Sequence, residues 1–156
     1  MKSLLTFVLF ACAICLYAQP VQAHCEIPCG IYDDQLRVRM IHEHTATIAK
    51  AMRQIKELSA EGDKNYNQIV RWITNKEKHA EEIQEIVYQY FMTQRIKPME
   101  GDMREKYIKE LTLLHEILIH AMKSKQGLDE SHPEKIDELL HEFSDSYFAA
   151  EAKGSH

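Results

Sequence analysis

Apolar residues recur at spacings of three and four along most of the chain, and this period constrains the fold more than any other feature. One face of a first helix runs through Leu36, Met40, Ile41, His44, Ile48, Met52 and Ile55. Asp33 or Asp34 can cap this helix, and Gly62 marks its end. A second helix opens at Asp63 or Asn65 and should stop before Pro98. Its inward residues are predicted to be Ile69, Ile73, Ala80, Ile83, Val87 and Tyr90.

Two further helices are predicted in the last third of the chain. Asp102 and Glu105 have the spacing of a capping box, and Ser131 and Glu134 repeat it. The stripe of the third helix is Ile108, Leu111, Leu114, Leu118 and Met122, with Gly127 closing it. The stripe of the fourth is Ile136, Leu139, Leu140, Phe143 and Tyr147. Nothing alternates with the period of a strand, so we predict an all-α fold, an antiparallel four-helix bundle. Such a bundle by itself says almost nothing about function.

The first 23 residues have the parts of a secretory signal peptide. A short positive start at Lys2 precedes an almost wholly apolar run from Leu4 to Tyr17, and the segment ends in the small residue Ala23. The apolar run is shorter than the roughly 18 residues that a transmembrane helix needs. We therefore expect residues 1–23 to be removed by a signal peptidase. Residues 24–156 would then form one domain, exported to the periplasm or the extracellular space, without stable membrane association after cleavage.

Charge and composition exclude some classes of partner. Without the signal the chain carries 18 basic and 24 acidic residues, a formal charge of −6. This balance argues against nucleic acid or an anionic membrane as the main partner.

Two of the four cysteines lie at the start of the predicted mature chain. Cys12 and Cys15 lie in the signal, whereas Cys25 and Cys29 remain, four positions apart and next to the new terminus at His24. A disulfide is one interpretation for an exported protein. A bridge closing so short a loop would constrain the chain little, because the entropic gain grows with loop size. Metal binding by the two thiolates is the other interpretation.

The nine residues from His24 to Tyr32 carry a more specific motif. They read His-Cys-Glu-Ile-Pro-Cys-Gly-Ile-Tyr, which resembles the nickel hook of the nickel superoxide dismutases, His-Cys-x-x-Pro-Cys-Gly-x-Tyr, at all six fixed positions. The predicted cleavage site falls directly before His24, where that family has its mature terminus. The segment 24–32 is therefore interpreted as a nickel hook and 33–156 as the helix bundle.

The resemblance implies a ligand set and a reaction. One nickel ion per chain would be held by His24 through its amine and ring, by Cys25 through its amide nitrogen and thiolate, and by Cys29 through its thiolate. Two nitrogens and two sulfurs in a plane suit nickel or copper rather than tetrahedral zinc. The enzyme would be an oxidoreductase that disproportionates superoxide to oxygen and hydrogen peroxide by cycling between Ni(II) and Ni(III).

Further roles follow from the same resemblance. His24 and Tyr32 would be the catalytic residues, with the Tyr32 hydroxyl near the open face of the metal. Pro28 and Gly30 would shape the hook, and the backbone amides near Glu26 and Cys29 would face the substrate. The family also assembles as a homohexamer. Separately, Arg37 and Arg39 follow the hook closely and are candidates for attracting the superoxide anion, although solvated arginines of a helix face explain them equally well.

The chain departs from some family members at the partner of the axial imidazole. Those members carry a glutamate early in the first helix, whereas Arg39 and Met40 stand near that position here. His79 stands where an arginine of the second helix is expected. The resemblance therefore assigns no hydrogen-bond partner to the His24 ring, and His42 and Glu43 are the nearby substitutes.

Two other classes of function remain open from the residues alone. The same nitrogens and thiolates could hold nickel or copper in an exported binding protein without turnover. A secreted helical module with a Cys25–Cys29 disulfide is the second alternative. The glycine, proline and tyrosine at their matching positions favour the enzyme over both.

Overall fold

The computed structural model describes residues 33–149, and these form four long helices. They are α2 (Asp34–Ala60), α3 (Tyr66–Glu85), α4 (Arg104–Gln126) and α5 (Ser131–Phe148). Three shorter segments join or extend them: η1 (Asp63–Asn65), η2 (Ile86–Arg95) and η3 (Gly101–Met103). The described part of the chain contains no strand, which confirms the predicted all-α class.

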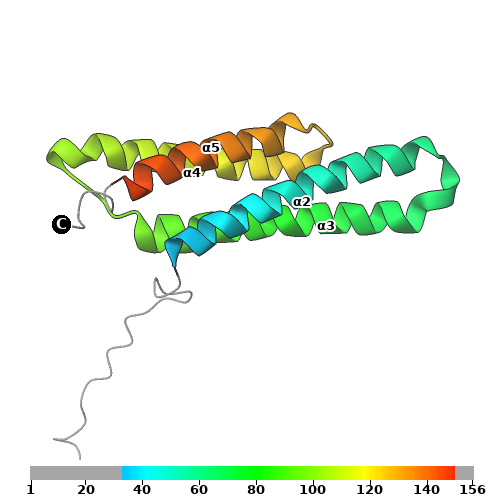
Figure 1. Ribbon diagram of the computed structural model, residues 1–156, viewed down its shortest axis with the longest axis horizontal. Coiled ribbons are helices and arrows are strands. Elements are labelled where there is room, and N and C mark those ends of the chain that lie inside the picture. The colour runs from blue at the N-terminus through cyan, green and yellow to red at the C-terminus, as the bar shows by residue number, and fades with distance from the viewer. Residues whose placement is uncertain (1–32, 150–156) are drawn as a thin grey trace, which may run out of the picture.

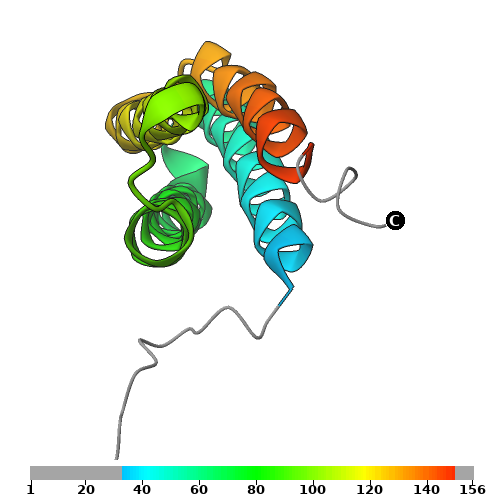
Figure 2. The same ribbon diagram turned by 90° about the vertical axis from the view of Figure 1, so that its left-hand side faces the viewer.

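The four helices run up and down in chain order, each antiparallel to the next (Figure 1). Viewed along its length, the bundle is a four-sided arrangement in which α2 packs beside α3 and α5, and α4 packs beside the same two helices (Figure 2). The start of α2 and the end of α5 therefore meet at the same end of the bundle as the end of η2. The predicted antiparallel four-helix bundle is confirmed.

The helix ends follow local chemistry, although two of the predicted caps are wrong. Asp33 caps α2 as expected, because its carboxylate accepts a hydrogen bond from the Gln35 amide at 3.0 Å. The Asp102 box does not form, since a short 3₁₀ turn precedes α4 and no side chain caps it. At α5 the acceptor is Asp129 rather than Ser131: its carboxylate receives the Ser131 amide at 3.0 Å.

The second helix changes its pitch before it ends. From Ile86 to Arg95 it widens into a π-helix, and the Ile96 amide donates to the Phe91 carbonyl five residues back. The wider turn keeps Ile86, Val87, Tyr90 and Phe91 on the buried side. Wide turns of this kind occur mostly where a helix must re-aim side chains, frequently at functional sites. The sequence pattern indicated a helix here but not its pitch.

The core is a continuous apolar cluster through the middle of the bundle, and one predicted stripe is rotated. The predicted core of α5 is confirmed: Ile136, Leu139, Leu140 and Phe143 are buried and Tyr147 packs against them. On α4 the buried residues are Glu110, Leu113, Leu114, Ile117, Ala121 and Ser124. The predicted stripe shares only Leu114 with this set, and its ends Ile108 and Met122 are exposed. Two of the buried positions on α4, Glu110 and Ser124, are polar, so the spacing of apolar residues alone did not indicate the buried face.

The outer part of the α2–α3 hairpin projects beyond α4 and α5 (Figure 1). Lys76 of α3 contacts the last turn of α4, so the residues of α3 before it have no fourth layer to cover them. This explains why Ile73 is exposed, contrary to the prediction, together with Tyr66 and Val70. Leu36, at the other end of the hairpin, is also exposed. No helix among the described residues is long and apolar enough to cross a membrane.

Candidate metal centre and the polar cluster beside it

The predicted ligands lie outside the described residues, but the point where the hook joins the bundle is well defined. His24, Cys25, Glu26, Pro28, Cys29, Gly30 and Tyr32 all precede Asp33, the first described residue. Asp34, two positions after Tyr32, begins α2 and is only 8% exposed. The segment that carries the hook motif is therefore followed directly by a buried carboxylate at the start of α2.

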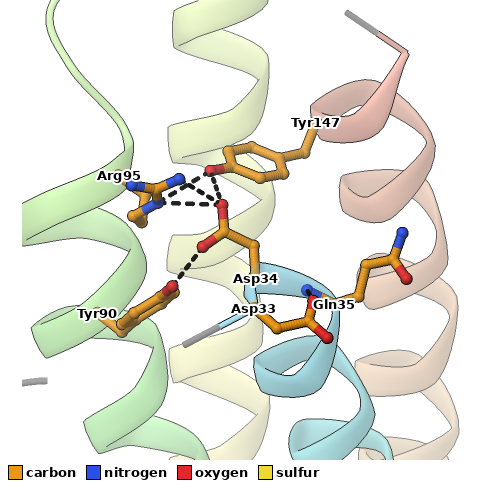
Figure 3. Close-up of polar contacts among 6 residues, drawn as sticks. All are labelled: Asp33, Asp34, Gln35, Tyr90, Arg95 and Tyr147. Carbon is orange, nitrogen blue, oxygen red and sulfur yellow. Dashed lines mark hydrogen bonds and ion pairs between the residues drawn. The ribbon is translucent and has the colours of Figure 1, made fainter. Parts of the chain in front are cut away.

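Asp34 is the centre of a hydrogen-bonded cluster that joins three helical segments (Figure 3). Its Oδ2 accepts from Arg95 of η2, with Nη2 at 2.6 Å and Nε at 3.0 Å. The same oxygen accepts from the Tyr147 hydroxyl of α5 at 2.7 Å. Its Oδ1 accepts a short hydrogen bond from the Tyr90 hydroxyl of η2. One carboxylate thus binds α2 to both segments that end beside it.

The cluster holds Asp34 ionised in a buried position. Burial alone would raise the pKa of Asp34, but the hydrogen bonds from Tyr90, Tyr147 and Arg95 and the charge of Arg95 together lower it. Burial and the bond to Asp34 raise the pKa of Tyr90 to about 12, and the same two causes raise the pKa of Tyr147. Both phenols therefore remain protonated donors at neutral pH.

Aromatic packing beneath the cluster fixes the two tyrosines. Phe91 makes edge-to-face contacts with Tyr90, at 5.2 Å between ring centroids, and with Phe143, at 5.0 Å. Tyr147 stacks on Phe143 at 5.3 Å. Buried phenols usually find a partner for the hydroxyl while the ring packs in the core. The rings and the wide turn of η2 thus aim both hydroxyls at Asp34.

The two candidate steering arginines have different surroundings. The guanidinium of Arg37 lies over the Tyr90 ring, 5.1 Å from its centroid, and its buried Nε has no hydrogen-bond partner among the described residues. Arg39 is on the surface, and its guanidinium pairs with Asp33 at 3.5 Å. It also lines an open groove between α2 and α5, together with Val38, His42, Leu140 and Ser144. Both arginines are within the first two turns of α2.

His42, one of the two residues considered as partners for the His24 ring, is engaged elsewhere in this structure, and so is His79, which stands where an arginine is expected. His42 pairs with Asp137 at 2.7 Å across the groove. His79 lies against His44, with 2.7 Å between the two Nδ1 atoms. The Nε2 of His44 is buried and has no partner among the described residues. A proton on Nε2 would be an unsatisfied buried donor, so we assign the shared proton to Nδ1 of His44, which donates to His79.

Sequence reasoning missed the function of the Asp34 cluster, although each member left some signal. Asp34 appeared only as an alternative cap, and Tyr90 and Tyr147 only as core residues. Two tyrosines on buried stripes need hydrogen-bond acceptors, and a carboxylate at a helix start is a candidate acceptor. Arg95 gave no signal, because the pitch of η2 decides where its side chain points.

Within residues 33–149, no three histidine, cysteine, aspartate or glutamate side chains are grouped so that they could hold a metal ion. The cysteine sulfurs and histidine nitrogens of residues 24–29 are donor types that suit nickel. This set differs from every cluster in the bundle because it combines sulfur and nitrogen donors. The donor chemistry of the hook therefore fits nickel.

The described residues form a four-helix bundle, and residues 24–32, which precede it, carry a motif of the metal-binding type. The nickel-containing superoxide dismutase family matches residues 19–151. This match spans the hook and all the described residues, and the chain belongs to that family. Searches among curated proteins and among solved structures give no match.

Membership fixes the class of reaction. The protein is a nickel superoxide dismutase, an oxidoreductase with nickel as its cofactor and superoxide as its substrate. The predicted enzyme class, cofactor and substrate are thereby confirmed.

Proposed function

We propose that the enzyme disproportionates superoxide at a nickel ion held by the mature N-terminus, with His24, Cys25 and Cys29 as its ligands. The observation that carries this proposal is the complete hook motif, placed directly after a signal-peptide pattern that ends at Ala23. Cleavage after Ala23 would free the amine of His24, which a longer chain lacks. When bound, the nickel would supply one-electron redox chemistry between its two- and three-valent states.

The residues of the chain have separate tasks in this proposal. The His24 ring would be one of the groups that hold the nickel, and the Tyr32 hydroxyl would hold water or substrate by hydrogen bonds. Backbone amides near Glu26 and Cys29 donate to the superoxide anion, where preorganised donors stabilise charge most effectively. Pro28 and Gly30 let the chain turn so that Cys29 returns to the metal.

Attraction of the anionic substrate would depend on the local field near the hook. The mature chain is negatively charged overall, but a local field can override net charge. Arg39 is the better candidate of the two arginines because its side chain is 57% exposed. The charge of Arg37 is placed over the Tyr90 ring and would act closer to the bundle.

Assembly and location extend the proposal. The signal-peptide pattern supports an exported enzyme that acts in the periplasm or outside the cell after processing by a signal peptidase. The resemblance supports a homohexamer. The exposed apolar residues Tyr66, Val70 and Ile73 on the projecting part of α3 provide surface that such an assembly could cover.

Intact mass, nickel content and superoxide disproportionation should be measured on one sample of the mature protein. We expect a mass starting at His24, about one nickel per chain because the hook offers one set of square-planar donors, and activity that is lost in His24→Ala and Cys29→Ser. His141→Ala is the matched control, since the side chain of His141 is 81% exposed on α5.

The other outcomes separate the alternatives. The correct terminus with nickel bound but no activity would indicate a metal-binding protein. A mass lower by the two hydrogens of a disulfide, unchanged when nickel is supplied during expression, would indicate a disulfide module. A mature terminus upstream of His24 in an active enzyme would contradict the proposed amine ligand.

A further inference from the structure

The Asp34 cluster is more elaborate than the start of a helix requires. Asp33 already caps α2, so Asp34 is not needed for that purpose. A buried carboxylate is costly, and apolar residues often replace buried ion pairs without loss of stability. Asp34 nevertheless receives donors from Tyr90, Arg95 and Tyr147. This arrangement specifies one position for the first residue of α2.

We propose that Asp34 is a positioning residue for the nickel hook: by binding η2 and α5 simultaneously, it fixes the point from which the hook leaves the bundle. This inference rests on the proposed function of residues 24–32. Cys29 is five positions before Asp34, so its Cα lies within roughly 18 Å of the Asp34 Cα. Tyr32 is only two positions away. The start of α2 is therefore a fixed point close in sequence to a proposed ligand and to the tyrosine that is proposed to bind substrate.

The direction of the contacts supports positioning rather than general stabilisation. Tyr90 of η2 donates to one oxygen of Asp34, whereas Arg95 of η2 and Tyr147 of α5 donate to the other (Figure 3). A carboxylate bound on both oxygens cannot rotate without breaking one set of bonds. Groups that orient metal ligands from outside typically change metal affinity or activity by about 10–100-fold when they are removed.

The chain offers a matched control at the same end of the bundle. Glu110 is also a buried carboxylate, 1% exposed, and it accepts from Ser146 at 3.0 Å and pairs with Lys106 at 3.5 Å. Its partners lie on α5 and α4. Glu110→Gln therefore makes the same chemical change as Asp34→Asn without touching the start of α2.

The test is the rate at which nickel is released to an excess of chelator from the mature, nickel-loaded protein. We expect release from Asp34→Asn to be about 10–100-fold faster than from wild type, and release from Glu110→Gln to be close to wild type. The electronic spectrum of the bound nickel should shift in Asp34→Asn only. Tyr147→Phe, which keeps the Arg95 pair, should release nickel at an intermediate rate.

The outcomes distinguish this inference from the proposed function. Equal release from Asp34→Asn and Glu110→Gln, with unchanged spectra, overturns the positioning role. If Asp34→Asn does not fold, a wild-type release rate in Tyr147→Phe overturns it as well. A wild-type protein that starts at His24 but holds no nickel overturns the proposed function, and the inference with it.

Discussion

Two buried charges on opposite sides of the core are accommodated in different ways. Asp34, at the hook end, faces the countercharge of Arg95 and two phenol donors. Lys76 of α3, 3% exposed, donates instead to the carbonyls of Ser124 and Lys125, both at 2.6 Å. These carbonyls belong to the last turn of α4, which has no intrahelical donors for them and carries partial negative charge.

The balance of energies differs between the two sites. At Asp34 the donors outweigh burial and the pKa is lowered, so the charged form is favoured. At Lys76 burial lowers the pKa, the charge of Glu77 opposes this and that of Lys125 adds to it, so the charged form is less favoured than in water. Lys76 donates to free carbonyls at the end of α4, and this contact does not need a carboxylate partner. The Asp34 carboxylate is kept ionised and in one orientation by its three donors, Tyr90, Arg95 and Tyr147.

Asp34→Ala should produce the largest loss of stability among these changes. It leaves the buried Tyr90 and the partly buried Arg95 and Tyr147 without the Asp34 acceptor. We expect a loss of about 3 kcal/mol, the lower end for breaking a buried pair, because the Arg95 side chain is 34% exposed. Denaturant unfolding of the mature protein would measure this loss. A loss below that of Lys76→Met would show that the Asp34 cluster does not hold the hook end together.

Tyr147→Phe should cost about 1.5–3 kcal/mol, the range for a hydrogen bond to a charged group. The ring still packs on Phe143, so the change removes one donor to Asp34 and leaves the aromatic contacts. The free energy of unfolding, compared with that of Tyr107→Phe on α4 as a control tyrosine, isolates the hydroxyl. A neutral result would assign the stability of the cluster to Arg95.

Lys76→Met should cost about 1–3 kcal/mol, because two carbonyls of α4 lose their donor. The methionine retains much of the apolar stem, so packing changes little. Activity per bound nickel should remain at the wild-type level, since the contact lies at the last turn of α4, at the opposite end of the bundle from the start of α2 (Figure 1). A gain in stability on substitution would mean that burying the cation outweighs its hydrogen bonds, and the contrast with Asp34 would then be larger.

The sequence predicts the fold well because the bundle depends on a regular apolar period. The helices, their order and the core of α5 follow from spacing, and Gly62 and Gly127 mark the ends of α2 and α4. The period fails where polar residues are buried. On α4, Glu110 lies inward, where it accepts from Ser146, and Ser124 lies inward where its carbonyl accepts from Lys76, so the buried stripe is rotated away from Ile108.

The hook motif is likewise legible from the sequence, because its chemistry resides in consecutive residues. The Asp34 cluster is not, since its four members are separated by up to 113 positions. Their meeting depends on the π-helical pitch of η2, which no local pattern of apolar residues indicates. The sequence therefore predicts which residues would hold the nickel, but it did not predict the Asp34 cluster.

The smallest effect on stability is expected at the His44–His79 pair, in which two partly buried imidazoles are joined by a hydrogen bond. Burial lowers the pKa of both imidazoles below 6.5, and the neighbouring charge of His79 lowers that of His44 further, while Glu43 and Glu82 oppose the shift. Lys78 lowers the pKa of His79, so the local charges do not all act in one direction.

As pH falls below about 6.5 the unfolded chain takes up protons first, and the folded state should lose stability. We expect the folded state to lose about 0.5–1.5 kcal/mol of stability. An additional proton on this pair would make both Nδ1 atoms donors, so the hydrogen bond between them would break. Unfolding curves between neutral pH and acid should show this slope in wild type and in the exposed control His141→Gln. The slope should be smaller in His79→Gln but not absent, because burial also lowers the pKa of His120. An unchanged slope in His79→Gln would assign the acid sensitivity to other groups, whereas a smaller slope would show that this pair is kept neutral where Asp34 is kept charged.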